Sequence, residues 1–221
     1  MSKLIINKRI LFSQTPKKDF FNDIEILVGN KNPPDNIWGV YADGYKEAAN
    51  LICEQIINKR VLKKYAMIYP AIYLYRHYLE LQFKNIIILT NKALSLLSTQ
   101  DESEKEMKYP SNHNLLNLYE VCLDNLKIFA IKIEEPEAIN EQEDFLELKK
   151  IIQEFEQYDK FSQSFRYPKD QKNNFNLQKI DIINIKNVYD VINKGTEVFD
   201  GIESWLDVRI DSIKDYLNCG I

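Results

Sequence analysis

The fold is decided by residues 69–84, which read YPAIYLYRHYLELQFK and continue into a further apolar run toward Leu97. Apolar side chains occupy nearly every position around a helix that contains this stretch. A helix that is apolar on all sides belongs in the middle of a bundle, where other helices surround it. Pro70 fits the first turn of this helix or a kink within it, because proline supplies no N–H to the helical ladder.

The chain on both sides of this central helix carries apolar residues at helical spacing. Ser111 or Asn112 can cap the next helix with a side-chain oxygen, and a further helix begins after Pro136. Gly195 and Gly201 are expected to bend or split the last helical region. The apolar positions that mark these helices are Tyr41, Tyr45, Ala48, Ala49, Ile52 and Ile56; Leu115, Leu116, Tyr119, Cys122, Leu123 and Leu126; Phe145, Leu148, Ile151, Ile152 and Phe155; and Ile185, Val188, Val191, Ile192, Val198, Phe199, Trp205 and Leu206.

Composition supports a single all-α domain. The chain has 221 residues with no Gly/Ser-rich or Pro-rich linker, and its 45% hydrophobic content excludes wholesale disorder. Six Gly and seven Pro are too few for a turn-dense sandwich or barrel. We therefore expect an up-and-down bundle of four or five helices over residues 41–221. Residues 1–40 are predicted to be a partly extended N-terminal arm, with short strands or extended segments near residues 4–6 and 24–28.

Several function classes gain no support from the sequence. No basic region followed by an apolar run opens the chain, and no apolar stretch reaches membrane-spanning length, so we expect a cytoplasmic protein without a membrane partner. Cys53, Cys122 and Cys219 are widely separated and are interpreted as reduced core thiols. With only two histidines, a metal site is disfavoured, and no cofactor is expected. The formal charge of -4 argues against a broad grip on phosphate backbones.

Charged residues interrupt the apolar central helix in one place. Arg76, Glu80 and Lys84 follow one another at four-residue intervals and therefore stack on one helix face. On a helix as apolar as this one, an unpaired charge costs several kcal/mol, so we expect each of them to have a partner. His77 lies beside this ladder of charges.

Three stretches, in their order along the chain, resemble the HEPN superfamily of helical bundles. They are Tyr75-Arg76-His77-Tyr78-Leu79-Glu80-Leu81 with Lys84, then His113-Asn114-Leu115, then Phe165-Arg166-Tyr167-Pro168. The resemblance covers roughly residues 40 to 200. It implies an up-and-down bundle that often forms dimers, and roles that range from ribonuclease toxins and phage defence to nucleotide binding and scaffolding.

Many HEPN nucleases carry an Arg that is followed, after four to six residues, by a His. In this chain the required positions before His77 are Pro70, Ala71 and Ile72, and those before His113 are Glu106, Met107 and Lys108. None of them is arginine. We therefore predict that the usual HEPN ribonuclease activity is absent, and we assign no catalytic residue.

Two interpretations of the polar residues remain open. In the first they are a buried network that fixes helix register, in which Arg166 pairs with Glu80 or Asp159. In the second they line a cationic cleft for RNA, a nucleotide or another phosphate-bearing ligand in a bacterial defence or toxin–antitoxin context. The alternative function is a non-catalytic scaffold that forms a homodimer or binds a protein partner. The candidate ligand-binding residues are Arg76, His77, Glu80, Lys84, His113 and Arg166.

Overall fold

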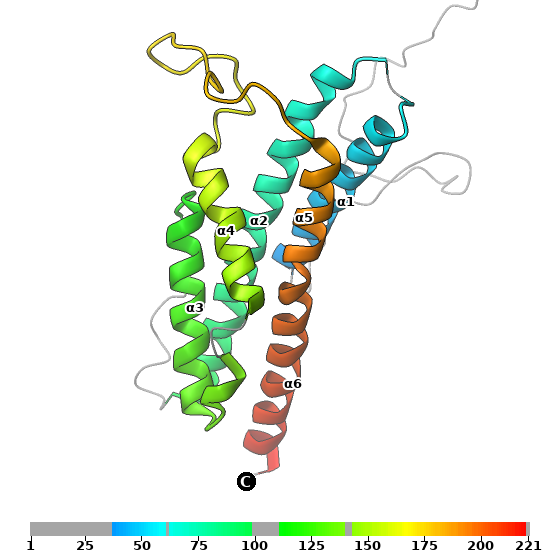
Figure 1. Ribbon diagram of the computed structural model, residues 1–221. Coiled ribbons are helices and arrows are strands. Elements are labelled where there is room, and N and C mark those ends of the chain that lie inside the picture. The colour runs from blue at the N-terminus through cyan, green and yellow to red at the C-terminus, as the bar shows by residue number, and fades with distance from the viewer. Residues whose placement is uncertain (1–36, 61, 99–110, 140–142, 220–221) are drawn as a thin grey trace, which may run out of the picture. The chain divides into compact units, whose positions relative to one another are not determined.

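The computed structural model describes residues 37–60, 62–98, 111–139 and 143–219 (Figure 1). The predicted N-terminal extended segments near residues 4–6 and 24–28 lie outside these ranges. Residues from Asn36 onward form one compact unit, and all of the described ranges belong to it.

Helices make up the fold of this unit. They are α1 (Ile37–Ile57), α2 (Lys64–Leu96), α3 (Leu115–Lys132), the 3-10 helix η2 (Pro136–Ile139), α4 (Glu143–Asp159), α5 (Ile185–Gly195) and α6 (Glu197–Cys219). Within the described ranges there is no β-strand, and only an isolated bridge joins Lys169 to Phe175. The prediction of an all-α bundle is confirmed for this part of the chain.

Helix α2 is the centre of the bundle, as its sequence predicts. It packs against α1, α3 and α6. The ring of Phe83 meets the edges or faces of Tyr119 from α3 and Phe199 from α6 at centroid distances of 6.1 and 5.2 Å. The buried apolar side chains of α2 are Ala71, Ile72, Tyr75, Tyr78, Leu79, Leu81, Phe83, Ile86, Ile87, Leu89 and Ala93.

Helix starts differ from the predicted ones. Helix α1 begins at Ile37, before the expected start at Tyr41. Helix α2 begins at Lys64, so Pro70 lies in its second turn rather than its first. The cap of α3 is Asn114, whose side chain accepts a hydrogen bond from the backbone N–H of Asn117 at 2.7 Å. The prediction of Ser111 or Asn112 as the cap is wrong, because the helical backbone starts only at Leu115.

The last helical region divides at one of its two glycines. Gly195 ends α5 and only Thr196 separates it from α6, so the two helices follow each other closely in Figure 1. A Cβ atom at Gly195 would overlap Cδ1 of Ile151 on α4, which explains why a residue without a side chain stands at this contact. Gly201 lies inside α6, where an added Cβ atom would meet no other atom within 4 Å, and it does not split the helix.

The cysteines are free thiols, two in the core and one on the surface. Cys53 and Cys122 are buried, as expected, whereas Cys219 is exposed at the last residue of α6. The prediction of a core position was wrong for Cys219, because residues 215–219 at the end of α6 are all exposed. No helix in the described ranges is long and apolar enough to cross a membrane.

Candidate functional site

Arg76 is the centre of a buried polar network. Its side chain is 0% exposed and donates from Nη1 to Glu80 Oε2 at 3.1 Å. It also donates from Nε to the backbone oxygen of Asp159 at 3.1 Å and from Nη2 to the backbone oxygen of His113 at 2.7 Å. A longer bond of 3.4 Å reaches the backbone oxygen of Lys160. One guanidinium group therefore ties α2 to the start of α3 and to the end of α4.

Glu80 holds the ladder of charges together. Its Oε1 atom accepts from Lys84 Nζ at 2.9 Å and lies 2.7 Å from His113 Nδ1, while Oε2 accepts from Arg76. Burial by itself raises the pKa of this carboxyl group, but the hydrogen bonds and positive charges of Lys84 and His113 outweigh burial and lower the pKa. Glu80 is therefore an ionised carboxylate with a partner on each oxygen, as a structural network requires.

Asp159 fixes the chain where α4 ends. Its Oδ1 atom accepts backbone hydrogen bonds from Gln163 at 2.6 Å and Ser164 at 2.7 Å. Its Oδ2 atom forms an ion pair with Arg76 Nε at 3.7 Å. Burial raises the pKa of this carboxyl group despite the opposing effects of Ser164 and Arg76. Asp159 thus sets the path of the segment that carries Arg166.

Arg166 does not pair with Glu80 or Asp159, so this part of the predicted network is wrong. The reason is that Arg76 already occupies both carboxylates. Arg166 is exposed instead, and its Nε donates to the backbone oxygen of Ser162 at 2.5 Å. Its guanidinium carbon lies 5.3 Å from the ring centre of Tyr73 and 5.6 Å from that of Tyr167, within cation–π distance of both.

The two histidines have different environments. The ring of His113 is 68% exposed on its outer side while its Nδ1 faces Glu80. His77 is half-buried between Tyr45, at a ring distance of 4.4 Å, and Tyr73, at 5.8 Å. Burial lowers the pKa of His77, and nearby positive charges add to this effect although Glu80 opposes it. Burial therefore favours the neutral form of the His77 ring.

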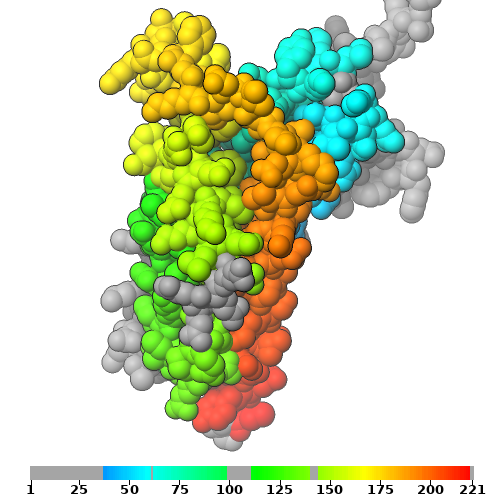
Figure 2. Space-filling model, viewed as in Figure 1, coloured from blue at the N-terminus to red at the C-terminus, as the bar shows by residue number. Residues whose placement is uncertain are grey.

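Exposed cations and aromatic rings alternate in the segment between α4 and α5. Lys160 Nζ lies 5.8 Å from the ring centre of Phe161, and Lys169 Nζ lies 4.6 Å from that of Phe175. In Figure 2 this segment, coloured yellow to orange, lies across the adjoining ends of α4 and α5. We call the following group the aromatic–cation surface: Tyr73, His77, Lys160, Phe161, Arg166, Tyr167, Lys169 and Phe175.

Sequence reasoning found only part of this surface. The signal was present in the alternation of Lys or Arg with Phe or Tyr along residues 160–169, KFSQSFRYPK. Basic residues among exposed aromatic rings are typical of single-strand binding. The tyrosines of α2 recur at helical spacing and were expected to serve packing; Tyr75 and Tyr78 are buried, whereas Tyr73 is half-buried with its ring near Arg166, and Tyr65 and Tyr69 are exposed.

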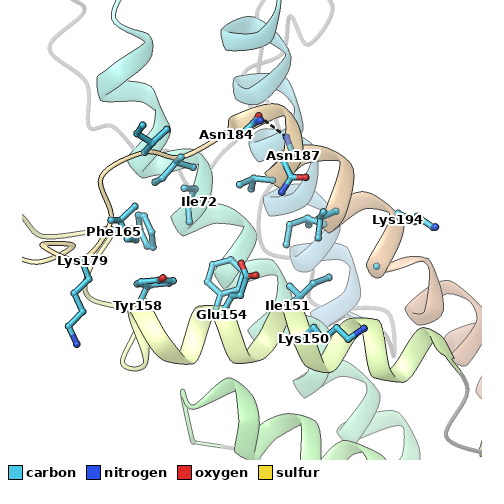
Figure 3. Close-up of a pocket in the computed structure, with 18 of the residues that line it drawn as sticks. Ile72, Lys150, Ile151, Glu154, Tyr158, Phe165, Lys179, Asn184, Asn187 and Lys194 are labelled. Atoms are coloured by element: carbon cyan, nitrogen blue, oxygen red, sulfur yellow. Dashed lines mark hydrogen bonds between the residues drawn. The ribbon is translucent and has the colours of Figure 1, made fainter.

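A groove lies between α4 and α5. Its volume is about 740 Å³, and it is lined by residues of α4 and α5 together with Ile72, Phe165 and residues 179–184. Figure 3 shows the apolar side chains of Ile72, Ile151 and Phe165 facing the space, with Lys179 and Lys194 at its margin. Ile72 and Phe165, which line the groove, are the sequence neighbours of Tyr73 and Arg166.

In the described ranges, no group of three or more His, Cys, Asp or Glu side chains is arranged to hold a metal ion.

Comparisons of the chain with protein-family models, with curated proteins and with solved structures found no match.

Proposed function

We propose that this protein binds single-stranded RNA on the aromatic–cation surface, without cleaving it. The observation that carries the proposal is the position of Arg166, an exposed guanidinium group between the rings of Tyr73 and Tyr167. Among the described residues no carboxylate forms an ion pair with Arg166, so its charge is available to a phosphate. Proteins recognise single-stranded RNA by stacking its bases on aromatic rings and guanidinium planes and by pairing its phosphates with cations.

Each exposed residue has a role in this proposal. The rings of Phe161 and Tyr167 are 71% and 50% exposed and offer faces for bases. Arg166 stacks or binds a phosphate, and Lys160 and Lys169 neutralise neighbouring phosphates. Three such cations are compatible with a net charge of -4, because the contact is local.

The buried network supports the surface from below. Arg76 does not contact the RNA in this proposal, because its N–H groups already donate hydrogen bonds to Glu80 and to the backbone oxygens of His113 and Asp159. These bonds hold the first residues of the α4–α5 segment against α2. Of the residues singled out in the sequence, Arg76, Glu80, Lys84 and His113 are therefore assigned to the buried network, His77 to packing against Tyr45 and Tyr73, and Arg166 to the ligand.

Binding without cleavage follows from the chemistry of the same groups. A general base needs an accessible acceptor near the reacting phosphate. Glu80 is occupied by three donors, and His77 is enclosed by two tyrosine rings. The Arg–His spacing of HEPN nucleases is also absent from the sequence. A setting in bacterial defence or a toxin–antitoxin pair is proposed on the HEPN resemblance alone.

The test measures the binding of a labelled single-stranded RNA of about 12 nucleotides by fluorescence anisotropy. Arg166→Met is expected to weaken binding by at least about fivefold, the lower end for the loss of one stacking contact. It should also reduce the slope of log K against log salt by about 0.7, the value for one phosphate contact on a single strand. Lys214→Met on α6 removes the same charge elsewhere and should leave binding unchanged. Equal affinities of wild type and Arg166→Met, or no binding by the wild type, would contradict the proposal.

One observation favours a second candidate, the protein-interaction module. The groove between α4 and α5 is mainly apolar, and Ile182 at its margin is 89% exposed. Self-association through this groove would cover Ile182. Light scattering after size exclusion should then show a dimer for wild type and a monomer for Ile182→Glu, and monomeric wild-type protein would exclude a homodimer.

A further inference from the structure

A second polar cluster lies where α2 meets α6, away from the network of Arg76. Glu203 of α6 accepts hydrogen bonds from Gln82 Nε2 at 2.6 Å and from Asn85 Nδ2 at 2.7 Å, and both bonds end on the same carboxylate oxygen, Oε1. Among the described residues no hydrogen bond to Glu203 Oε2 occurs. The amide side chains are deeply buried, at 3% exposure for Gln82 and 1% for Asn85.

The cluster leaves two buried oxygen atoms without a donor. Gln82 Oε1 and Asn85 Oδ1 have no hydrogen-bond partner among the described residues. Each is bonded to the same carbon as a nitrogen that donates to Glu203 Oε1. Exchanging the oxygen and nitrogen atoms of either amide does not supply the missing donor. The amide oxygen would then lie against the carboxylate oxygen of Glu203, which is also an acceptor, and the NH2 group would have no acceptor. Buried acceptors of this kind require an explanation, such as an ion that completes the site.

Acidic side chains act on Glu203. Burial raises the pKa of Glu203, and the charges of Asp43 on α1 and Asp200 on α6 raise it further. Burial and Asp200 likewise raise the pKa of Asp43. The nearby cation is Lys46, which acts on Asp43 and lies 5.3 Å from the ring centre of Tyr78. Carboxylates therefore outnumber the ammonium group of Lys46 among the charges that act on Glu203 and Asp43.

The backbone of α1 approaches this cluster closely at a glycine. A Cβ atom at Gly39 would lie 3.0 Å from Asn85 Nδ2 and 3.6 Å from Glu203 Oε1. The absence of a side chain at Gly39 leaves room for Asn85 and Glu203 to meet between three helices.

We propose that Glu203, Gln82 and Asn85 bind a hard divalent cation, Mg²⁺ or Ca²⁺. The ligands are Oε2 of Glu203 and the two unpartnered amide oxygens, and water completes the coordination. Carboxylate and amide oxygens are the donors that these cations prefer. Asp43 and Asp200 attract the ion from outside its coordination shell. The site is independent of RNA binding and differs from the histidine-based metal site that the sequence disfavours.

Calorimetric titration of the full chain at neutral pH with Ca²⁺ and, separately, with Mg²⁺ tests this site and distinguishes the two ions. We expect one saturable site for at least one of them. Glu203→Gln retains the size of the side chain and should abolish binding, and Asp43→Asn should weaken it by about tenfold. Glu197→Gln removes an exposed carboxylate from the first turn of the same helix and should bind as wild type does.

A second measurement keeps the test decisive if Glu203→Gln does not fold. Substoichiometric Mn²⁺, a paramagnetic substitute for Mg²⁺, should broaden the side-chain amide NMR signals of Gln82 and Asn85 in the wild-type protein before other signals. Three results would overturn the site: no saturable binding by wild type, equal binding by a folded Glu203→Gln variant, or Mn²⁺ broadening that leaves the two amides unaffected. Protonation of Glu203 in place of cation binding would give the first of these results.

Discussion

Replacing Arg76 by methionine should be among the most destabilising single changes in this protein. Methionine retains an unbranched apolar stem but removes every donor. The ion pairs to Glu80 and Asp159 are lost, as are the hydrogen bonds to the backbone oxygens of His113 and Lys160. Glu80 retains Lys84 and His113, whereas Asp159 Oδ2 is left as a buried charge without a counter-ion.

The size of the effect follows from this burial. Removing one partner of a buried ion pair costs about 3–5 kcal/mol, because the remaining charge stays desolvated. Domains of ordinary stability unfold at a cost of about 5–15 kcal/mol, so Arg76→Met should remove a large part of the total. Arg166→Met offers a matched control, since Arg166 is exposed and, among the described residues, its hydrogen bond is to the backbone oxygen of Ser162. Its cost should be below about 1 kcal/mol, as for other exposed charges.

Urea unfolding followed by circular dichroism and by tryptophan fluorescence measures both variants. The midpoint should fall strongly for Arg76→Met and little for Arg166→Met, with the two probes in agreement. RNA binding should weaken for Arg166→Met and change little for Arg76→Met, when Arg76→Met is assayed under conditions in which it is folded. If Arg76→Met costs no more stability than Arg166→Met, the assignment of Arg76 to a buried structural network is incorrect.

Three other predictions concern packing, protonation and thiol access. Gly195→Ala should destabilise the protein by about 1–3 kcal/mol, because the added methyl group overpacks against Ile151 of α4. Gly201→Ala should stabilise the protein by about 0.5–1 kcal/mol, because alanine has the higher helix propensity and the added methyl group meets no neighbour. Equal urea midpoints for the two variants would contradict the contact between Gly195 and Ile151. The pKa of Glu80 in the folded protein is below its ordinary value of 4.5, so ionised Glu80 stabilises the fold above pH 4.5, and this stabilisation is lost as the pH falls through the folded-state pKa. The pKa of Glu203 is above 4.5, so protonated Glu203 stabilises the fold below pH 4.5, and this stabilisation is lost as the pH rises through the folded-state pKa. Unfolding free energies of Glu80→Gln and Glu203→Gln, each relative to wild type, should therefore change in opposite directions with pH, and parallel trends would refute the assignment. Cys219 should react with a thiol reagent in the folded protein while the two buried cysteines react only after denaturation, and reaction of all three at one rate would be inconsistent with this core.

The candidate site was only partly predictable. The contact of Glu80 with its neighbours on α2 follows from four-residue spacing, and the structure has both ion pairs. The contact of His113 with Glu80 spans 33 positions of sequence and does not follow from local spacing. The place of Arg166 was not predictable, because Arg76 and Arg166 are chemically equivalent competitors for the same carboxylates. The packing of the helices decides which one is buried, and it places Arg76 against Glu80 and Asp159.

The sequence by itself determined that this chain forms helices and that residues 69–84 lie among the others, because helical periodicity and an apolar circumference are local properties of consecutive residues. The tertiary structure alone decided which polar groups meet. Arg76 reaches Asp159 across 83 positions of sequence, and Glu203 reaches Gln82 across 121. Such pairs depend on how helices pack and turn relative to one another, and packing is a collective result of the whole core rather than of any one stretch. For the same reason Arg76, and not Arg166, pairs with the buried carboxylates, and Arg166 is an exposed cation between two tyrosine rings.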